Sequence, residues 1–338
     1  MNNYNRRNFI RMAALTGAGL SISGSISPLF AKSSSSTGKR VGIIGLDTSH
    51  AVAFTKTLNA PDADAIYGGY KVVAAYPKGS NDIKSSVDRI AGYTEDVKKQ
   101  GVEIVDSIAD LLTKVDVVLL ETNDGRLHLE QAMQVFKAGK PMFIDKPIAA
   151  SLDDAKAIFD AAKKYKVPVF SSSSLRYIAG ISETELEKIG KVLGAETFSP
   201  AQLEKTHPDL FWYGIHGVEM LFTIMGTGCK TVTRIHTEDT DVVVGVWNDG
   251  RVGSFRGTRN GTHDYGGRVF GEKGNVTLGA FTGYNSLLEK IISFFETGIV
   301  PVKPEETLEI CAFMEAADES KAKGGMPVSM ESLLNKTK

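Results

Sequence analysis

The sequence has little cysteine and almost no net charge. Its two cysteines, Cys229 and Cys311, are far apart and lack the spacing of metal ligands. We therefore expect two free, buried thiols and no metal centre. The formal net charge is −1, and no basic block follows the N-terminal segment, which excludes nucleic acid as an expected partner.

The composition is that of an ordinary globular protein. With 338 residues, 42% of them hydrophobic, the chain is long enough for two domains with cores of their own. We predict a targeting segment and linker at 1–38, a dinucleotide-binding domain at 39–150 and a second domain at 151–338.

The N-terminal segment resembles a twin-arginine export signal. Arg6 and Arg7 precede Phe9, and an uncharged stretch rich in Gly, Ser and Ala runs from Met12 to Phe30. We expect recognition by the twin-arginine export machinery, cleavage after Ala31 and a periplasmic location. The Gly and Ser content argues against a membrane span, and no nearby cysteine could carry a lipid anchor.

Short apolar strands alternate with amphipathic helices in the first domain, which predicts a parallel, doubly wound α/β sheet. The expected strands are 40–45, 71–76, 102–105, 115–120 and 141–144, and the expected helices are 50–59, 85–100, 108–114 and 127–138.

The first strand-to-helix turn would hold the diphosphate of a dinucleotide. A glycine fingerprint would place glycine at 45, 47 and 50, but the sequence has Gly45, Asp47 and His50. Either Asp47 turns away to cap the helix, leaving Thr48 and Ser49 for the phosphates, or it occupies the anion site itself. His50 either packs between helix and strand or faces the nicotinamide.

Two other strand ends carry polar candidates. No acid follows the second strand near Tyr76, where a fold specific for NAD would place one, whereas Lys78 and Ser80 could hold a 2′-phosphate. This favours NADP slightly over NAD, although an ordinary exposed turn fits as well. Thr122 and Asn123 end the fourth strand and could line the nicotinamide ribose.

The run Met142-Phe143-Ile144 predicts a buried strand that ends in Asp145-Lys146-Pro147. Ligands of open α/β sheets bind at this edge. Lys146 is thus placed to hold a substrate hydroxyl or steer a proton, and Asp145 lies beside it in the cofactor site.

The second domain begins with a helix over 151–165, N-capped by Ser151. Further on, the apolar spacing predicts one helix through residues 211–222, with Trp212, His216 and Glu219 on a shared face. Alternating segments then predict a large, open and mostly antiparallel sheet, with strands at 231–236, 241–247, 252–258, 267–270 and 275–280.

Five segments together resemble the Gfo/Idh/MocA family of glucose-fructose oxidoreductase and inositol 2-dehydrogenase. They are Val41 to Gly45, Asn123 to His128, Ala138 to Pro147, Gly214 to His216, and Gly271 to Gly274. The resemblance implies a Rossmann domain, a C-terminal domain with an open sheet, and pairing into dimers or tetramers. It also implies NAD(P)-dependent chemistry on sugars or cyclitols, with Lys146 and His216 in the catalytic roles.

The resemblance places Arg176 and Tyr177 on a turn that faces the substrate, although Arg176 could equally be solvated. It puts Trp212 where the family often has an aspartate, and a tryptophan there could stack on a sugar face.

We therefore expect an exported oxidoreductase that acts on a secondary hydroxyl of a sugar, cyclitol or glycoside and keeps its NAD or NADP tightly bound. The alternative is a carbohydrate-binding protein of the same fold that has lost its cofactor; Asp47, His50 and Trp212 support it.

Overall fold

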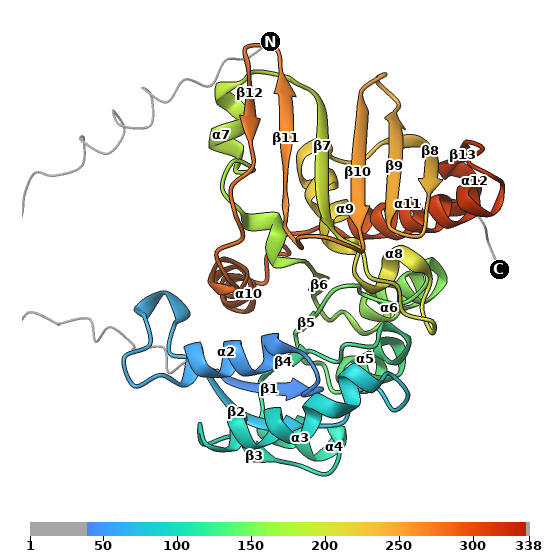
Figure 1. Ribbon diagram of the computed structural model, residues 1–338. Coiled ribbons are helices and arrows are strands. Elements are labelled where there is room, and N and C mark those ends of the chain that lie inside the picture. Colours follow the sequence, from blue (N-terminus) through green and yellow to red (C-terminus); the bar gives the residue numbers. More distant parts are fainter. Residues whose placement is uncertain (1–38, 336–338) are drawn as a thin grey trace, which may run out of the picture. The chain divides into compact units, whose positions relative to one another are not determined.

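The computed structural model describes residues 39–335. The predicted export signal and cleavage point lie outside the described residues. Two sheets organise the described part of the chain (Figure 1).

The first sheet has six parallel strands in the order β3-β2-β1-β4-β5-β6, the doubly wound arrangement of a Rossmann fold. Its strands are β1 (Arg40–Ile44), β2 (Lys71–Tyr76), β3 (Glu103–Ile104), β4 (Val117–Leu120), β5 (Met142–Ile144) and β6 (Val169–Ser171). Its helices are α2 (Ser49–Asn59), α3 (Lys84–Lys98), α4 (Ile108–Lys114), α5 (His128–Lys137) and α6 (Leu152–Tyr165).

Burial explains why the central strands read as continuous apolar runs. Every residue of β4 and β5 is buried, as expected for parallel strands covered on both faces. One face is covered partly by α10 (Asn285–Thr297), whose Leu287 and Ile291 share a core cluster with Val41 and Phe143. A helix from late in the chain thus completes the core of the first sheet.

The second sheet has seven strands in the order β12-β11-β7-β10-β9-β8-β13. All its pairs are antiparallel except β7 with β10. The strands are β7 (Val192–Pro200), β8 (Cys229–His236), β9 (Thr240–Trp247), β10 (Val252–Thr258), β11 (Gly266–Gly271), β12 (Gly274–Thr277) and β13 (Val328–Ser329). The predicted fold class is therefore confirmed.

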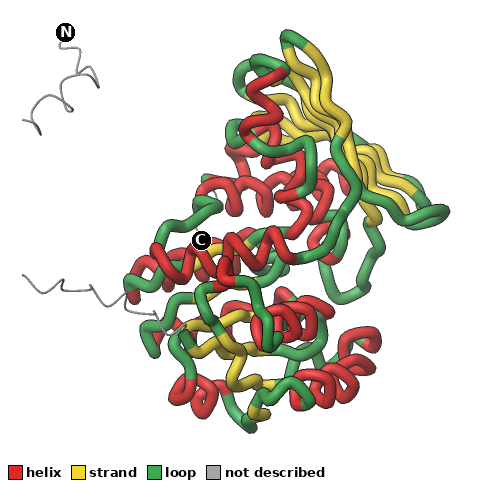
Figure 2. The backbone as a smooth tube through the Cα atoms, turned by 90° about the vertical axis from the view of Figure 1, so that its left-hand side faces the viewer, coloured by secondary structure: helices red, strands yellow, loops and turns green. Residues whose placement is uncertain are grey.

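Helices cover one face of this second sheet, and the other face is open (Figure 2). Contacts with α9 (Ile215–Met225) and α11 (Pro304–Ala322) account for most of the covered face. The approach of α9 is close, since a Cβ on Gly217 would lie 2.2 Å from the Phe255 ring. The remaining helices are α7 (Glu183–Lys188), α8 (Asp209–Trp212) and α12 (Met330–Leu334).

The structure departs from the sequence predictions in three places. Strand β7 was not predicted, although it joins β10 to β11. Strand β6 pairs with β5, so the first sheet continues past the boundary predicted at residue 150. The prediction of a single helix over 211–222 is wrong, because the helix is interrupted at Tyr213 and Gly214, between α8 and α9.

Two simpler expectations can be compared directly with the structure. Cys229 and Cys311 are free and buried, as predicted. Within residues 39–335, no helix combines the length and apolar character needed to cross a membrane.

Candidate active site

A cavity of about 330 Å³ lies at the carboxyl edge of the first sheet, where segments of both sheets meet. It contains both predicted catalytic residues, Lys146 and His216. The residues that line it are Thr48, Ser49, His50, Arg89, Tyr93, Asn123, Asp145, Lys146, Ser174, Leu175, Tyr213, His216, Tyr265, Phe281 and Tyr284.

The turn between β1 and α2 delivers the N-terminus of an 11-residue helix to this cavity. Gly45 has φ +88°, and a Cβ there would lie 2.5 Å from the Thr122 backbone, so only glycine fits. The Thr48 side chain does not cap the helix. The buried Thr48 and Thr122 hydroxyls lack hydrogen-bond partners among the described residues. Unused donors therefore gather where an anion would bind.

Asp47 does turn away from the cavity, as the first of the two predicted alternatives requires, but it does not cap the helix. Its fully buried carboxylate accepts the backbone N–H of Ser80 at 3.2 Å and that of Asn123 at 3.0 Å. Burial raises the pKa of Asp47, and these two amides oppose the rise. The Asp47 carboxylate, in the loop after β1, thus links the loops after β2 and β4 through hydrogen bonds.

The residues behind the slight preference for NADP do not line the cavity. Ser80 is buried, and its hydroxyl donates to Asp124 at 2.9 Å. Lys78 is exposed on the same turn. Arg126 closes the outside of the turn by bridging Asp82 and Asp124.

His50 is the third departure from the glycine fingerprint, and it points inward. Its Nδ1 lies 3.1 Å from Asp145 Oδ1 and 3.7 Å from Glu121 Oε2. Its ring meets that of Tyr284 edge-on at 4.3 Å. Burial lowers the pKa of His50, but the two carboxylates outweigh it and raise the pKa to about 10. Burial raises the pKa of Glu121 to about 7. Lys146 Nζ lies 3.6 Å from Asp145 Oδ2.

The His216 ring is fixed by a hydrogen bond at one of its two nitrogens. Its Nδ1 lies 2.7 Å from Ser173 Oγ, and Nε2 has no hydrogen-bond partner in the described part of the chain. Glu219 does not touch the ring; it binds the Ser173 backbone N–H at 2.9 Å and Arg176 Nε at 2.9 Å. Burial lowers the pKa of His216 well below its ordinary value, and the positive charge of Lys146 adds to the effect. The ring is therefore neutral at neutral pH.

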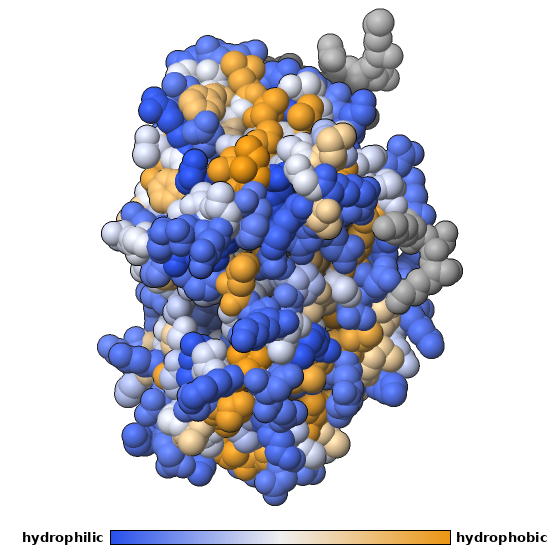
Figure 3. All heavy atoms as spheres, turned by 45° about the vertical axis from the view of Figure 1, so that its right-hand side comes forward, coloured by the Kyte–Doolittle hydropathy of each residue, from blue (hydrophilic) through white to orange (hydrophobic). Residues whose placement is uncertain are grey.

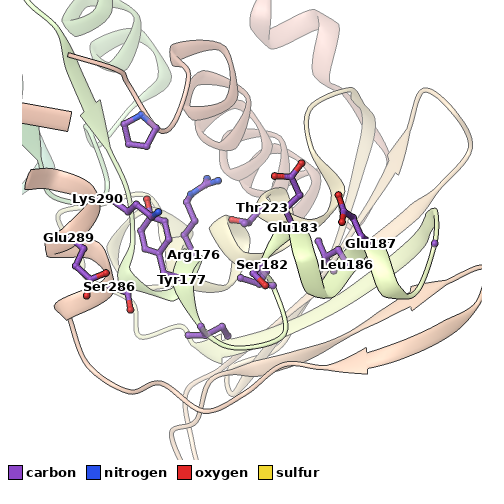
Figure 4. Close-up of a pocket in the computed structure, with 14 residues that line it drawn as sticks. Arg176, Tyr177, Ser182, Glu183, Leu186, Glu187, Thr223, Ser286, Glu289 and Lys290 are labelled. Atoms are coloured by element: carbon purple, nitrogen blue, oxygen red, sulfur yellow. The ribbon is translucent and has the colours of Figure 1, made fainter. Parts of the chain in front are cut away.

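Arg176 and Tyr177 line a different, larger cavity of about 850 Å³ (Figure 4). Arg176 is fixed there between Glu219 and Glu306 at 2.9 and 2.7 Å. The structure therefore does not bring these two predicted substrate contacts into the cavity that holds Lys146.

Trp212 ends α8 and packs against the His207 ring at 5.1 Å, outside the lining of the cavity. Its neighbour Tyr213 takes the place at the cavity instead, and its hydroxyl lies 3.0 Å from that of Tyr265. Tyr265, Phe281 and Tyr284 come from loops, and no local sequence pattern pointed to them.

Comparison with known families agrees with this geometry. Residues 39–173 match the Gfo/Idh/MocA model, described as an oxidoreductase family with an NAD-binding Rossmann fold. This range contains the whole first sheet, so the first part of the chain is similar to the NAD-binding domain of that family.

Two curated relatives match less than half of the chain. One is an uncharacterized protein of Saccharomyces cerevisiae, 26% identical over 156 residues and 45% of this chain. The other is an uncharacterized oxidoreductase of Streptococcus pneumoniae, 27% identical over 151 residues and 39% of this chain. The chain spans 41% of the length of each.

Solved structures share the fold over most of the chain. A probable dehydrogenase from Thermotoga maritima is 22% identical with TM-score 0.70, covering 87% of this chain and 99% of its own. An oxidoreductase from Agrobacterium radiobacter, solved with NAD+, L-tartaric acid and magnesium, is 16% identical with TM-score 0.68, covering 88% and 99%. The scyllo-inositol dehydrogenase of Lactobacillus casei is 16% identical with TM-score 0.67, covering 87% and 98%.

Replacing Asp47 by Ala should destabilise the protein, because it leaves two buried backbone N–H groups unpaired. We expect the free energy of unfolding to fall by about 1 to 3 kcal/mol, measured by urea denaturation. Asp47→Asn, which keeps an acceptor oxygen, should lose less. Equal stability of Asp47→Ala and the unaltered protein would show that the carboxylate does not hold these loops.

Proposed function

We propose that the protein is an exported NAD(P)-dependent oxidoreductase that acts on a secondary hydroxyl of a sugar, cyclitol or glycoside. The observation that carries this proposal is the shared cavity of Lys146 and His216, which also receives the free N-terminus of α2. The Rossmann domain of an NAD-binding oxidoreductase family supports it.

The residues fit the diphosphate and nicotinamide parts of such a cofactor. Thr48 and Ser49 at the start of α2 would hold the diphosphate, and the partnerless Thr48 hydroxyl is available for it. Asn123 and Asp145 would border the nicotinamide ribose. Asp47 binds the Ser80 amide at the turn after β2, so Arg89 and Tyr93 of α3, which line the cavity, would hold the adenosine end.

The chain's own residues would prepare the substrate for oxidation. Lys146 would donate a hydrogen bond to the reacting hydroxyl oxygen, and Nε2 of neutral His216 would take its proton. Ser173 fixes the ring through Nδ1 at 2.7 Å. The bound nicotinamide would supply the acceptor for the hydride.

A polyol or sugar suits the rest of the cavity. Aromatic rings of Tyr213, Tyr265, Phe281 and Tyr284 line it. Flat apolar surfaces next to hydroxyl and charged groups match the alternating faces of a sugar or cyclitol ring. The shared fold with an inositol dehydrogenase supports the same substrate class.

A second candidate is a carbohydrate-binding protein without a cofactor. The turn after β2 favours it, because Asp47 occupies the Ser80 and Asn123 backbone amides, which then cannot bind a nucleotide. Such a protein would bind a carbohydrate in the aromatic cavity and would not bind a dinucleotide.

Export is proposed on the sequence alone, from Arg6, Arg7 and the uncharged stretch that follows them. An exported enzyme meets little free NAD(P), which is why we propose a cofactor that stays bound and is recycled.

Denaturing the purified protein distinguishes the two candidates. We expect about one NAD or NADP per chain in the released small molecules, identified by absorbance and mass. With an active substrate found among sugars and cyclitols, Lys146→Ala should lower kcat/KM by about 10²- to 10⁴-fold. Lys98→Ala, an exposed lysine at the end of α3 that does not line the cavity, is the matched control and should change nothing. No released dinucleotide, together with no binding of added NAD(H) or NADP(H), would favour the carbohydrate-binding protein.

The pH dependence of kcat/KM should report the lowered pKa of His216. The neutral ring accepts the proton, so activity is lost only as pH falls through this pKa. The loss should therefore lie below the value of about 6.5 that is usual for histidine, with no decline between pH 6.5 and 8. Lys146, His50 and Asp145 provide the nearby charges. Half-loss of activity at or above pH 6.5 would exclude His216 as this base.

We also propose self-association through the open face of the second sheet. Ile235, Val246 and Val252 are exposed there at 64%, 37% and 49%. In Figure 3, hydrophobic side chains form patches among hydrophilic ones in the upper half of the view. Light scattering should give at least twice the chain mass of 36.4 kDa, and Ile235→Lys with Val246→Lys should shift it toward the monomer. A monomeric unaltered protein would exclude this interface.

A further inference from the structure

Three side chains that can bind a metal converge where β4, β5 and α2 meet. His50 Nδ1 lies 3.1 Å from Asp145 Oδ1 and 3.7 Å from Glu121 Oε2. One ligand atom from each residue lies within 4.8 Å of the others. Glu121 and Asp145 are fully buried, and His50 is 5% exposed.

Most of the carboxylate oxygens in this group lack a donor. Both oxygens of Glu121 and Oδ2 of Asp145 have no hydrogen-bond partner in residues 39–335. Lys146 Nζ approaches Asp145 Oδ2 only to 3.6 Å, beyond hydrogen-bond distance. Buried carboxylates normally accept several hydrogen bonds, and leaving them without partners is costly. His50 Nδ1 carries at most one proton and can donate it in a good hydrogen bond to only one carboxylate. At 3.1 Å, that carboxylate is Asp145, through Oδ1.

The spacing suits a cation placed between the three groups. Zinc bonds to nitrogen and oxygen are about 2.0 to 2.2 Å long, so neighbouring ligand atoms around one ion stand about 3 to 3.5 Å apart. The distances from His50 to Asp145 and Glu121 lie close to that range. A bound cation would draw the three ligand atoms, which lie within 4.8 Å of one another, closer together.

We propose that His50, Glu121 and Asp145 bind one divalent cation, such as Zn²⁺ or Mn²⁺, at the edge of the cavity. The two positive charges of the cation balance the two carboxylates. His50 and Asp145 also line the cavity, so coordination positions are left for a ligand oxygen. A sugar or cyclitol with adjacent hydroxyls would supply such oxygens beside Lys146.

This site gives a reason for a histidine where the glycine fingerprint would have its third glycine. A glycine at position 50 would bring α2 close to the sheet and provide no ligand. The inference does not depend on the oxidoreductase proposal, because cation binding is measured without nucleotide or substrate.

The test uses the full chain after treatment with a chelator. Titration calorimetry with ZnCl₂ and MnCl₂ should show one saturable site per chain, and Co²⁺ should give visible d–d absorption bands. Glu121→Gln and His50→Gly should each weaken binding by at least about tenfold. Glu309→Gln, a buried glutamate bound to the Gly228 and Cys229 amides, is the matched control and should bind like the unaltered protein.

Thermal unfolding keeps the test decisive if a variant is less stable. Added Zn²⁺ should raise the Tm of the unaltered protein and of Glu309→Gln, but not that of Glu121→Gln or His50→Gly. The absence of saturable binding would overturn the proposal and leave a protonated His50 as the countercharge of both carboxylates. Equal affinity in all four proteins would also overturn it, because the cation would then bind elsewhere.

Discussion

The carboxyl edge of the parallel sheet is where this chain buries its charges, and each of them needs a partner. Asp47, Glu121 and Asp145 are all fully buried there. Backbone amides satisfy Asp47, while His50 and Lys146 lie beside Asp145. Because an unpaired buried charge costs several kcal/mol, the loops after β1, β2, β4 and β5 must adopt the arrangement that pairs Asp47 and Asp145 and brings His50 near Glu121. The same pairing brings Lys146 to the cavity wall.

The fold was predictable where local pattern decides it. The boundaries of β2, α4 and β10 follow the predicted ranges, because caps, apolar periodicity and turn residues act within a few neighbours. Strand β7 escaped prediction because its Gly194, Ala195 and Pro200 carry weak strand propensity. Its pairing with β10 and β11, both distant in the sequence, determines its conformation. The break at Tyr213, whose φ is −135°, escaped for a similar reason, because the apolar spacing continues across it.

The candidate site was predictable where residues end strands. Lys146, Asn123 and Thr48 reach the cavity because the ends of parallel strands meet at one edge. Tyr265 and Tyr284 were missed because a loop's reach depends on tertiary packing. Arg176 was assigned to the substrate, but Glu219 and Glu306 hold it at another cavity. His128, which ends one of the family-like segments, is buried and hydrogen-bonded to the Thr122 and Ile148 carbonyls at 2.7 and 3.0 Å.

The two lost glycines are best understood together. Asp47 joins the β2 and β4 loops, and His50 joins α2 to the ends of β4 and β5. Each replacement therefore adds a polar contact between loops that a glycine could not make. We expect a loop fixed by these contacts to be ordered before a ligand binds, so that binding does not carry the entropic cost of ordering it. A substrate that shares this cavity with the cofactor must therefore fit an edge already set by buried charges, which favours a small, hydroxyl-rich molecule.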